Sequence, residues 1–595
     1  MSLIKNLNTD QKKAVTFEGG PLLVLAGAGS GKTRVLIYRV AYLIKKRLIS
    51  PQNALLLTFT NKAADEMKKR IAGLVDSAPY FSGTFHAFCA RTLRIDGKEA
   101  NIDNNFVIYD ERDSKDAIQQ ILDNLSISKD SFKPSSVLSA ISEAKSKMIK
   151  PLTYGEIARG DWQKKVFKIY VNYEKLLKKN NALDFDDLLL KTVYLFRDSP
   201  ETLDKWKNRL THVFVDEWQD TNKIQYELIK LLVGDGKGLT VVGDASQSIY
   251  SWRGANYRNI NQLQKDFPEL TVINLEQNYR STQNILTAAN AVISKNTLHP
   301  ILNLWTKNDE GEKIKIFRAK SGLEEASFVI SESIKLTKNG FTHKDVAILY
   351  RTNAQSRIFE EAMLHQGVPY ALVGGTRFYD RAEVKDVLAL LRALVNPKDT
   401  VSINRIEKLG VRRKQKFEEL KDSITPSLKE MSTLEIMDTV LEKTNYLSKY
   451  KRESEENLSR LENIKELRSV ATEFPEIHNF LENVALVQGN ELSSQSSGNN
   501  NSVTLMTLHA AKGLEYPVVF VVGLEEGLFP HSRSLYDAEQ LEEERRLAYV
   551  GMTRAEKLLY LSFANKRLYF GQRTANPPSR FLIDIPEDLL ETTDN

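Results

Sequence analysis

Short apolar runs without polar interruptions alternate along the chain with longer segments of helical periodicity. Runs of this kind are typical of strands that are buried on both faces of a parallel sheet. They fall into two groups, which predicts two α/β units of similar design. The first group comprises PLLVLA (21–26), ALLLTF (54–59), HVFV (212–215), LTVV (239–242) and TVINL (271–275). The second group comprises KIKIF (313–317), VAILY (346–350), VTLMTL (503–508), PVVFVV (517–522) and LLYLSF (558–563).

Two long helix-rich segments without such runs separate the predicted strands, one at 89–187 and one at 385–502. We expect each to be a mainly helical insertion into the neighbouring α/β unit. The second segment ends in QGNELSSQSSGNNNS (488–502), whose Ser, Asn and Gly content predicts a flexible linker. The predicted α/β domains then comprise 1–88 with 188–279, and 280–384 with 503–595.

Composition places the chain among ordinary globular proteins, since 42% of its 595 residues are apolar and 27% are charged. The single cysteine, Cys89, excludes an internal disulfide framework and a cysteine-based zinc site, and we expect it to be a small buried residue. The sequence has no long uncharged apolar run and no apolar N-terminal region, so neither a membrane span nor a secretory signal is expected. The formal net charge of +6 is by itself weak evidence for a nucleic-acid partner.

The sequence AGAGSGKT (26–33) directly follows a predicted strand and opens the helical pattern TRVLIYRVAYLI (33–44). This order of strand, loop and helix is the context that a phosphate-binding P-loop needs. Small residues let backbone N–H groups turn toward phosphate oxygens, and the helix N-terminus adds partial positive charge. Lys32 is the candidate for contact with the β and γ phosphates, and Thr33 for coordination of Mg²⁺. The strict pattern begins with Gly, whereas this chain has Ala26.

Two acids and two arginines are candidates for the remaining chemistry of nucleotide hydrolysis. Asp216 and Glu217 follow the run HVFV, and we expect the first to face Mg²⁺ and the second to orient the attacking water. An isolated Asp-Glu pair is more often a solvated turn, but together with the P-loop it favours an ATPase or GTPase. Arg280 and Arg554 could approach a γ-phosphate as arginine fingers, although an isolated arginine is more often a surface ion-pair residue.

With these motifs in place, the chain resembles the UvrD/Rep/PcrA group of superfamily 1A DNA helicases over nearly its whole length. The family motifs occur in the family order. Besides the P-loop, the matching segments are LNTDQKKAV (7–15), LLLTFTNKAADEM (55–67), GTFHAFCARTLR (83–94), ALDFDDLL (182–189), VDEWQD (215–220), VVGDASQSIYSWRGA (241–255), LEQNYRSTQNIL (275–286), VAILYRTNAQSR (346–357), GGTRFYDRAEVKD (374–386), VTLMTLHAAKGLEYPVVF (503–520) and EEERRLAYVGMTRA (542–555).

The resemblance implies two RecA-like domains with ATP between them, and helical insertions of the kinds called 1B and 2B in the family. It also implies ATP-driven translocation on single-stranded DNA in the 3′→5′ direction and unwinding of duplex DNA, in DNA repair or replication restart. The implied partners are single-stranded and forked DNA, with the protein acting as a monomer or self-associating on the DNA. We expect a cytoplasmic location, associated with the nucleoid while the protein is on DNA.

The same resemblance assigns roles to matching residues around ATP and Mg²⁺. The implied contacts are Gln11 and Tyr279 with the adenine, Glu515 with the sugar, Gln247, Arg280 and Arg554 with the γ-phosphate, and Thr33 and Asp216 with Mg²⁺. The implied catalytic residues are Lys32, Asp216, Glu217, Gln247, Arg280 and Arg554. The implied residues of the phosphate loop and its helix are Ala26, Gly27, Ala28, Gly29, Ser30, Gly31, Lys32, Thr33 and Arg34.

Binding of single strands without sequence preference requires aromatic faces for the bases and hydrogen-bond donors for the phosphates. Phe59, Tyr250 and Trp252 are the predicted stacking residues, and Phe59 could equally be the last core residue of its strand. The other predicted DNA contacts are Asn61, Thr84, His86 and Arg253 in the first domain and Arg351, Asn353 and His509 in the second.

Departures from the family pattern leave alternatives open. Trp218 stands where the family more often has Tyr or Phe, and Ala245-Ser246 stands where many relatives carry acids or Pro-Asp. The second insertion is short, and its LGVRRKQKFEEL (409–420) follows the family only loosely, so duplex unwinding is less securely predicted than translocation. The alternatives are a single-strand translocase that displaces proteins, the helicase half of a helicase–nuclease, and a nucleotide-switched scaffold. No nuclease-like block follows the last motif, and we expect no docking module in the short C-terminal segment.

Overall fold

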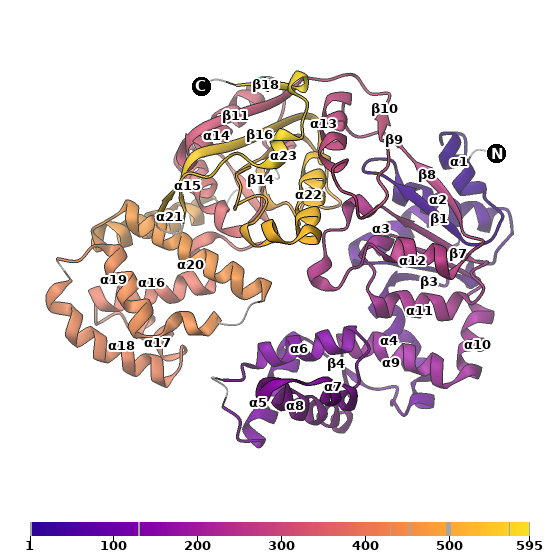
Figure 1. The fold of residues 1–595 in the computed structure, drawn as a ribbon, viewed down its shortest axis with the longest axis horizontal. Helices are drawn as coiled ribbons and strands as arrows, with labels where there is room; N and C mark the ends of the chain where they lie inside the picture. The colour runs from indigo at the N-terminus through magenta and orange to yellow at the C-terminus, as the bar shows by residue number, and fades with distance from the viewer. Residues whose placement is uncertain are drawn as a thin grey trace. The chain divides into compact units, whose positions relative to one another are not determined.

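The computed structural model describes residues 3–75, 77–128, 131–428, 430–450, 454–494, 501–569 and 572–593 (Figure 1). Contacts within the chain divide it into two compact units. The first unit comprises Met1–Tyr279 and His299–Leu304, and the second comprises Arg280–Leu298 and Trp305–Asn595. Each unit contains one large parallel sheet, so the expected α/β class with two sheets is confirmed.

The sheet of the first unit has six strands in the order β3-β2-β6-β7-β1-β8, and every neighbouring pair is parallel. All five apolar runs of the first group lie in it. The strand β3 was not predicted, because its sequence FSGT is not an apolar run and it lies at an edge of the sheet. The strands are β1 (Leu22–Ala26), β2 (Ala54–Thr58), β3 (Phe81–Thr84), β6 (His212–Val215), β7 (Leu239–Gly243) and β8 (Thr271–Leu275).

Helices cover both faces of this sheet, which explains why five of its six strands are apolar runs. Successive side chains alternate between two cores: Leu23 lies with one set of helices, whereas Leu22 and Val24 lie with the other. The first core is completed mainly by α4 (Phe85–Asp96), α9 (Phe185–Asp198), α10 (Pro200–Arg209), α11 (Lys223–Val233) and α12 (Asn259–Asp266). The second is completed by α1 (Thr9–Thr16), α2 (Lys32–Lys45) and α3 (Asn61–Ala72).

The predicted first insertion is mainly helical and has a core of its own, to which Ile118, Ile141 and Tyr173 belong. It also contains two short parallel strands that were not expected from the sequence. Val107 and Ile108 of the first of these strands are exposed, so no buried apolar run marks it. The elements are β4 (Val107–Tyr109), α5 (Glu111–Asn124), α6 (Pro134–Ser146), α7 (Pro151–Ile157), α8 (Gly160–Lys179) and β5 (Ala182–Asp184).

The large sheet of the second unit has the order β13-β14-β12-β15-β16-β11-β18, with parallel neighbours, and β17 pairs antiparallel with β16. All five runs of the second group lie in it. The strands are β11 (Ile314–Ser321), β12 (Val346–Tyr350), β13 (Tyr370–Val373), β14 (Val503–Thr507), β15 (Tyr516–Val521), β16 (Ala555–Tyr569), β17 (Gln572–Thr574) and β18 (Leu590–Thr592). The other elements outside the insertions are β9 (Gln277–Asn278) in the first unit, and α13 (Gln283–Ile293), β10 (Trp305–Thr306), α14 (Gly322–Lys338), α15 (Ser356–Gln366), α22 (Ala538–Met552) and α23 (Arg580–Ile583) in the second.

The predicted second insertion is helical, with a separate core. Its last helix extends to Ser494, so the predicted linker is wrong for residues 488–494, while residues 495–500 lie outside the described part of the chain. Val484 and Val487 anchor this helix in the core, and adding residues to an existing helix costs little. The helices are α16 (Ala382–Val395), α17 (Thr400–Glu407), α18 (Val411–Ile424), α19 (Thr433–Lys443), α20 (Glu455–Glu473) and α21 (Ile477–Ser494).

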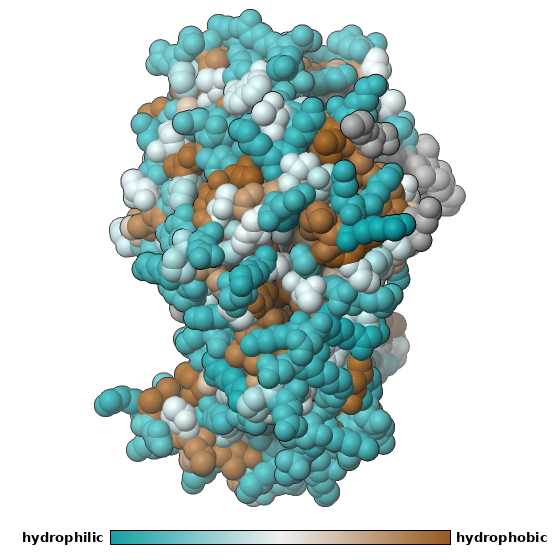
Figure 2. All heavy atoms as spheres, turned by 90° about the vertical axis from the view of Figure 1, so that its right-hand side faces the viewer, coloured by the Kyte–Doolittle hydropathy of each residue, from teal (hydrophilic) through white to brown (hydrophobic). Residues whose placement is uncertain are grey.

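Hydrophilic side chains predominate on the face of the molecule drawn in Figure 2, and apolar ones gather there in small groups. Among the described residues, no helix has the length and apolar character needed to cross a membrane. The division of the two units into four domains stays a prediction.

Candidate functional site

The loop between β1 and α2 has the backbone conformation that the P-loop sequence predicts. Gly29 and Gly31 have φ values of 65° and 85°, which a residue with a side chain adopts at a cost. Gly31 precedes α2, and no side chain caps the amide groups of the first helical turn. The positive end of the helix therefore points into the loop, where it favours an anion. Ala26, which replaces the first glycine, is fully buried as the last residue of its strand.

Hydrogen bonds hold the carbonyl oxygens of this loop, one from within the loop and three from other segments. The bonds run from Ser30 Oγ to the Gly27 carbonyl (2.8 Å), from Asn278 Nδ2 to the Ala28 carbonyl (2.7 Å), from the Tyr279 N–H to the Gly29 carbonyl (2.9 Å) and from Gln11 Nε2 to the Ser30 carbonyl (3.0 Å). Fixing the carbonyls fixes the planes of the peptide groups, and hence the directions of the amide groups available to phosphate oxygens.

The ammonium group of Lys32 is buried at the mouth of this loop. Its Nζ has no hydrogen-bond partner among the described residues, and the nearest carboxylate oxygen, Asp244 Oδ2, is 4.0 Å away. A buried ammonium without hydrogen bonds is costly, because it has lost its hydration without replacement. A phosphate oxygen supplies the missing acceptor, so the residues present fit a nucleoside polyphosphate.

Thr33 and Asp216 lie side by side, with Thr33 Oγ1 donating to Asp216 Oδ2 at 3.3 Å. Burial, followed by repulsion from Glu217, raises the pKa of Asp216 to about 7, and nearby Lys32 opposes the shift. A hydroxyl and one carboxylate fit Mg²⁺, which commonly binds one or two protein carboxylates together with water and substrate phosphates. In the described part of the chain, no group of three or more His, Cys, Asp or Glu side chains could hold a metal ion.

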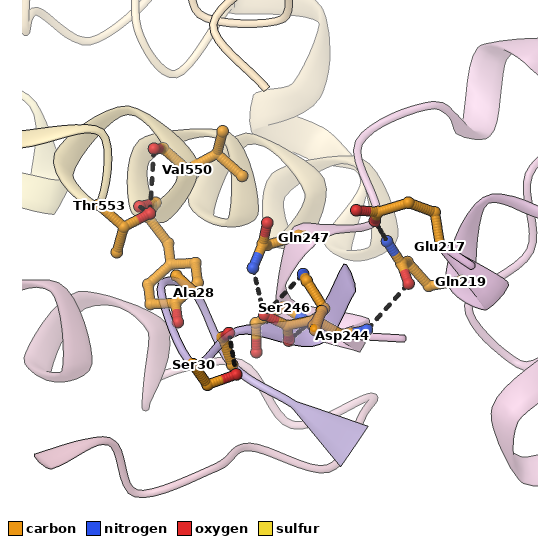
Figure 3. A network of polar contacts seen from close by, with 12 residues as sticks. Ala28, Ser30, Glu217, Gln219, Asp244, Ser246, Gln247, Val550 and Thr553 are labelled. Atoms are coloured by element: carbon orange, nitrogen blue, oxygen red, sulfur yellow. Dashed lines mark hydrogen bonds and ion pairs between the residues drawn. The ribbon is translucent and has the colours of Figure 1, made fainter. Parts of the chain in front are cut away.

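A chain of polar contacts connects Gln247 with Glu217 through Asp244 and Gln219 (Figure 3). Gln247 Nε2 donates to Asp244 Oδ2 at 2.5 Å, the Asp244 N–H donates to Gln219 Oε1 at 2.8 Å, and Gln219 Nε2 donates to Glu217 Oε2. Burial raises the pKa of Asp244, and attraction to Lys32 opposes this. Glu217 has a φ of 51°, which is unusual for a residue with a side chain. The predicted γ-phosphate contact, Gln247, and the residue predicted to orient the attacking water, Glu217, are therefore connected through Asp244 and Gln219.

Of the two predicted adenine contacts, Gln11 lies in the first turn of α1, and Tyr279 contacts Asn8, the residue that caps this helix. The side chain of Asn8 accepts from the Gln11 N–H at 2.7 Å, and Gln11 Oε1 accepts from the Asn8 N–H at 3.2 Å. Asn8 Nδ2 also donates to the Tyr279 hydroxyl at 2.8 Å, and the Tyr279 side chain is 45% exposed. The side chain of Gln11 also donates to the Ser30 carbonyl, so it connects the cap of α1 with the phosphate loop. Arg34, also predicted at the nucleotide, donates to the Asn6 carbonyl at 3.1 Å.

The second unit holds the other predicted nucleotide residues, and each has protein partners. Arg280 donates from Nε to Glu515 Oε2 at 2.7 Å and from a guanidinium nitrogen to the Thr553 carbonyl at 3.1 Å. Glu515, the predicted sugar contact, thus pairs with a predicted γ-phosphate contact. Arg554 is buried at the end of α22, where it donates to the carbonyls of Val550 (2.9 Å) and Leu514 (3.2 Å) and to Thr553 Oγ1 (3.1 Å).

In the first unit, the predicted DNA contacts include three aromatic residues beyond the ends of the strands, of which one is exposed and two are half-buried. Trp252 is 50% exposed in the short helix η5 (Ser251–Arg253), and its ring centroid lies 6.4 Å from that of Tyr250. Phe59 is half-buried and packs against the core, with its ring centroid 5.7 Å from that of Phe85. It therefore contributes to the core, and its contact with DNA stays a prediction. The side chain of Arg253 lies outside the described part of the chain.

The other predicted contacts of the first unit lie at helix N-termini. Asn61 is the exposed first residue of α3, and Thr84 caps α4 by accepting from the Ala87 N–H at 3.3 Å. Burial lowers the pKa of His86, whose ring lies 5.8 Å from that of Phe185. Phe185 is 51% exposed and is an aromatic candidate that sequence reasoning missed. In the sequence, Phe185 stands between two acids in ALDFDDLL. This pattern fits an exposed aromatic residue and a core residue equally well.

In the second unit, Arg351 is paired with a carboxylate. Its Nε and one terminal nitrogen both donate to Glu544 of α22, at 3.0 Å and 2.6 Å, and Arg351 in turn lowers the pKa of Glu544 despite burial. Asn353 is half-buried at the start of the short helix η7 (Asn353–Gln355), and His509 is half-buried beyond β14. The DNA role of these residues stays a prediction.

Comparisons with known proteins match both units of the chain. The domain family described as UvrD/REP helicase N-terminal domain matches residues 7–268. The family described as UvrD-like helicase C-terminal domain matches residues 273–438 and 411–566. A Staphylococcus aureus protein named ATP-dependent DNA helicase PcrA is 43% identical over 642 aligned positions, covering 99% of this chain and 87% of the relative. The Staphylococcus epidermidis protein of the same name is 43% identical over 643 positions, covering 99% and 88%.

Proposed function

We propose, from the premise that this chain belongs to the UvrD/REP helicase family, that it is an ATP-dependent DNA helicase. The observation that carries the proposal is the buried Lys32 ammonium, which has no hydrogen-bond partner among the described residues and faces the amide-lined phosphate loop. The two Staphylococcus relatives are named for the same activity and align over almost the whole chain.

ATP is the proposed substrate, with Lys32 binding its terminal phosphates and the loop amides holding the others. Thr33 and Asp216 would hold Mg²⁺, which when bound neutralises phosphate charge and orients the phosphates. Glu217 would orient the attacking water and accept its proton, since a carboxylate held by Gln219 keeps a fixed direction. Gln247 would contact the γ-phosphate, and this contact would affect the carboxylate of Asp244, to which Gln247 donates a hydrogen bond.

The second unit would supply Arg280 and Arg554 to the same γ-phosphate. For this the two arginines must exchange protein partners for phosphate oxygens, because their donors are bonded to Glu515 and to backbone carbonyls. Such an exchange makes hydrolysis depend on a rearrangement of the second unit, which is what a motor requires.

Single-stranded DNA is the proposed track. Tyr250, Trp252, Phe185 and His86 would stack on bases or contact them, since a π-face recognises any base. The 3′→5′ direction, the use of forked DNA, action in repair or replication restart and a monomeric or self-associating form are proposed from the family resemblance. A cytoplasmic location is likewise a prediction.

Unwinding of two matched duplexes, one with a 3′ single-stranded tail and one with a 5′ tail, tests the proposal. With ATP and Mg²⁺ we expect strand separation of the 3′-tailed duplex, and little of the 5′-tailed one. The control replaces ATP by a non-hydrolysable analogue and is expected to show none. Preference for the 5′ tail would overturn the direction, and ATP-independent separation would overturn the motor.

A further inference from the structure

The chain passes between the two units more than once near the nucleotide site. It leaves the first unit after Tyr279, and the segment His299–Leu304 then returns to that unit before the chain continues in the second at Trp305. We call His299–Leu304 the return segment. No residue of it belongs to a family motif quoted above, yet both of its ends contact such motifs.

The first residue of the return segment contacts the turn that carries Gln247. His299 is buried, and its Nε2 lies 3.2 Å from Ser246 Oγ, within hydrogen-bond distance. Ser246 belongs to the short helix η4 (Ala245–Gln247), and its N–H donates to Asp244 Oδ1 at 3.0 Å (Figure 3). The His299 contact is therefore one residue from Gln247 and one hydrogen bond from the carboxylate to which Gln247 donates.

The last residue of the return segment contacts the phosphate loop. Leu304 is buried, and a Cβ atom added to Gly27 would lie 2.3 Å from Leu304 Cδ2. The leucine side chain is thus packed directly against the backbone of the loop. Between the two ends, the Asn303 N–H donates to Glu276 Oε1 at 3.3 Å, close to the residues that follow β8.

We propose that the return segment is a positioning element for ATP hydrolysis, with His299 fixing the Gln247 turn and Leu304 fixing the phosphate loop. The inference rests on the proposed ATPase function. Since the residues on either side of the segment belong to the second unit, a movement of that unit acts on both contacts through the covalent chain. His299 and Leu304 act through Ser246 and Gly27 and are positioning residues.

At the His299 end of the segment, we expect the contact to affect the position of Gln247 more than the affinity for ATP. Gln247 has to face the γ-phosphate during hydrolysis, and small displacements of such groups lower the rate of a reaction far more than they weaken binding. At the Leu304 end, the contact is with a loop that holds ATP before reaction. Loss of the His299 contact is therefore expected to lower kcat, and loss of the Leu304 contact to raise KM for ATP. A segment that only stabilises the fold would not separate the two effects.

The first test compares His299→Leu, which removes the contact with Ser246, with His299→Gln, whose amide can reach the position of Nε2. DNA-stimulated kcat for ATP is expected to fall on the order of tenfold in the Leu variant, with KM for ATP changed less than about twofold. The Gln variant is expected to recover most of kcat. Combined with Ser246→Ala, the Leu variant is expected to show no further loss, because both changes remove one interaction.

The second test compares Leu304→Ala with Leu298→Ala. Leu298 is the residue just before the segment and is 38% exposed, so it provides the matched control. We expect Leu304→Ala to raise KM for ATP several-fold and to weaken binding of a fluorescent ATP analogue equally, while Leu298→Ala leaves both as in wild type.

Unchanged kcat and KM in His299→Leu and Leu304→Ala, with only a lower melting temperature, would overturn the inference and leave the proposed function intact. Additive losses in the Ser246 double variant would also overturn it. Absence of DNA-stimulated hydrolysis in wild type would instead overturn the proposed function, so the two failures are distinguishable. If His299→Leu does not fold, Ser246→Ala, which removes the same contact from its other side, and Leu304→Ala decide the matter through their effects on kcat and KM.

Discussion

Lys32 in the first unit and three arginines in the second, all predicted to contact ATP or DNA, differ in their surroundings. The ammonium group of Lys32 in the first unit is buried and has no hydrogen-bond partner within the described part of the chain. Arg280, Arg351 and Arg554 of the second unit are bonded to Glu515, Glu544 and backbone carbonyls. The first unit therefore presents a preformed phosphate site, whereas the second presents cations that are already engaged.

This difference suggests a division of labour. A preformed site binds ATP without a cost of reorganisation, because its amide groups and its ammonium already face the phosphates. Engaged arginines contribute only after they exchange partners, so their effect on hydrolysis can be switched by whatever moves the second unit. The substitutions below sharpen or break this contrast, beginning with the largest expected effect.

Lys32→Ala removes the cation of the preformed site. ATP turnover with DNA is expected to fall at least about a thousandfold, because a group that stabilises transition-state charge is lost. Circular dichroism is expected to match wild type, since no hydrogen bond of Lys32 Nζ to a described residue is broken. Retained DNA-stimulated hydrolysis would contradict the assignment of the P-loop.

Arg554→Ala tests whether an engaged arginine also acts at the γ-phosphate. DNA-stimulated kcat is expected to fall about a thousandfold, as for loss of an arginine finger, whereas binding of an ATP analogue changes little. Arg580→Ala is the matched control, because Arg580 is 40% exposed and its partner is Glu526. If both variants keep wild-type turnover, Arg554 only stabilises the end of α22. The difference between the two units would then have no bearing on hydrolysis.

Several parts of this arrangement could be predicted from the sequence, because their signals are local. The central strands are continuous apolar runs, and AGAGSGKT specifies its own turn and helix start. The edge strand β3 escaped prediction because FSGT is not an apolar run, whereas YALV of β13 is such a run and was not recognised as a strand, although its side chains alternate between half-buried and exposed. The partners of the arginines also escaped: Arg351 and Glu544 are 193 positions apart, and nothing in either local sequence indicates the other.

Trp252→Ala tests the DNA track of the first unit. Loss of one stacking partner is expected to cost about 1–3 kcal/mol per base, or roughly 5- to 150-fold in affinity for a labelled single strand. Basal ATP turnover is expected to stay close to wild type. Trp305→Ala is the control, since Trp305 is 44% exposed in the second unit and is no predicted DNA contact. Equal losses of DNA affinity in both variants would contradict the proposal that single-stranded DNA binds specifically at Trp252.

Glu544→Gln weakens the hold on Arg351 while keeping the shape of the side chain. If Arg351 contacts DNA phosphate after an exchange of partners, single-strand affinity is expected to rise a few-fold and its dependence on salt to steepen by about one phosphate contact. Fluorescence anisotropy across a salt series measures both. Unchanged affinity and salt dependence would make the Arg351–Glu544 pair purely structural.

Lys145 is a useful contrast to Lys32, because it is a fully buried lysine with partners. Its Nζ lies 2.8 Å from Asp184, 2.9 Å from Asp187 and 3.0 Å from Glu174. Burial, followed by repulsion from Asp184, raises the pKa of Asp187 to about 7. The folded protein thus holds the Asp187 proton more tightly than the unfolded chain, in which this pKa is about 3.9.

The stabilising contribution of that proton is complete below about pH 4 and is lost as the pH rises toward 7. Asp187→Asn removes the dependence, so the free energy of unfolding of wild type should fall relative to the variant over this range. Urea titrations at pH 4.5, 6 and 7.5 measure the difference, and we expect the smallest effect of the series on ATP turnover. If the difference in free energy of unfolding between wild type and Asp187→Asn does not vary with pH, Asp187 does not carry a proton in the folded protein over this range.

ATP turnover by the wild-type protein, measured with and without single-stranded DNA, tests the account most directly. With the phosphate site of the first unit preformed and the arginines of the second engaged, turnover is expected to be low without DNA and to rise by at least about tenfold when a single strand is added. A rate that is the same with and without DNA would contradict the account.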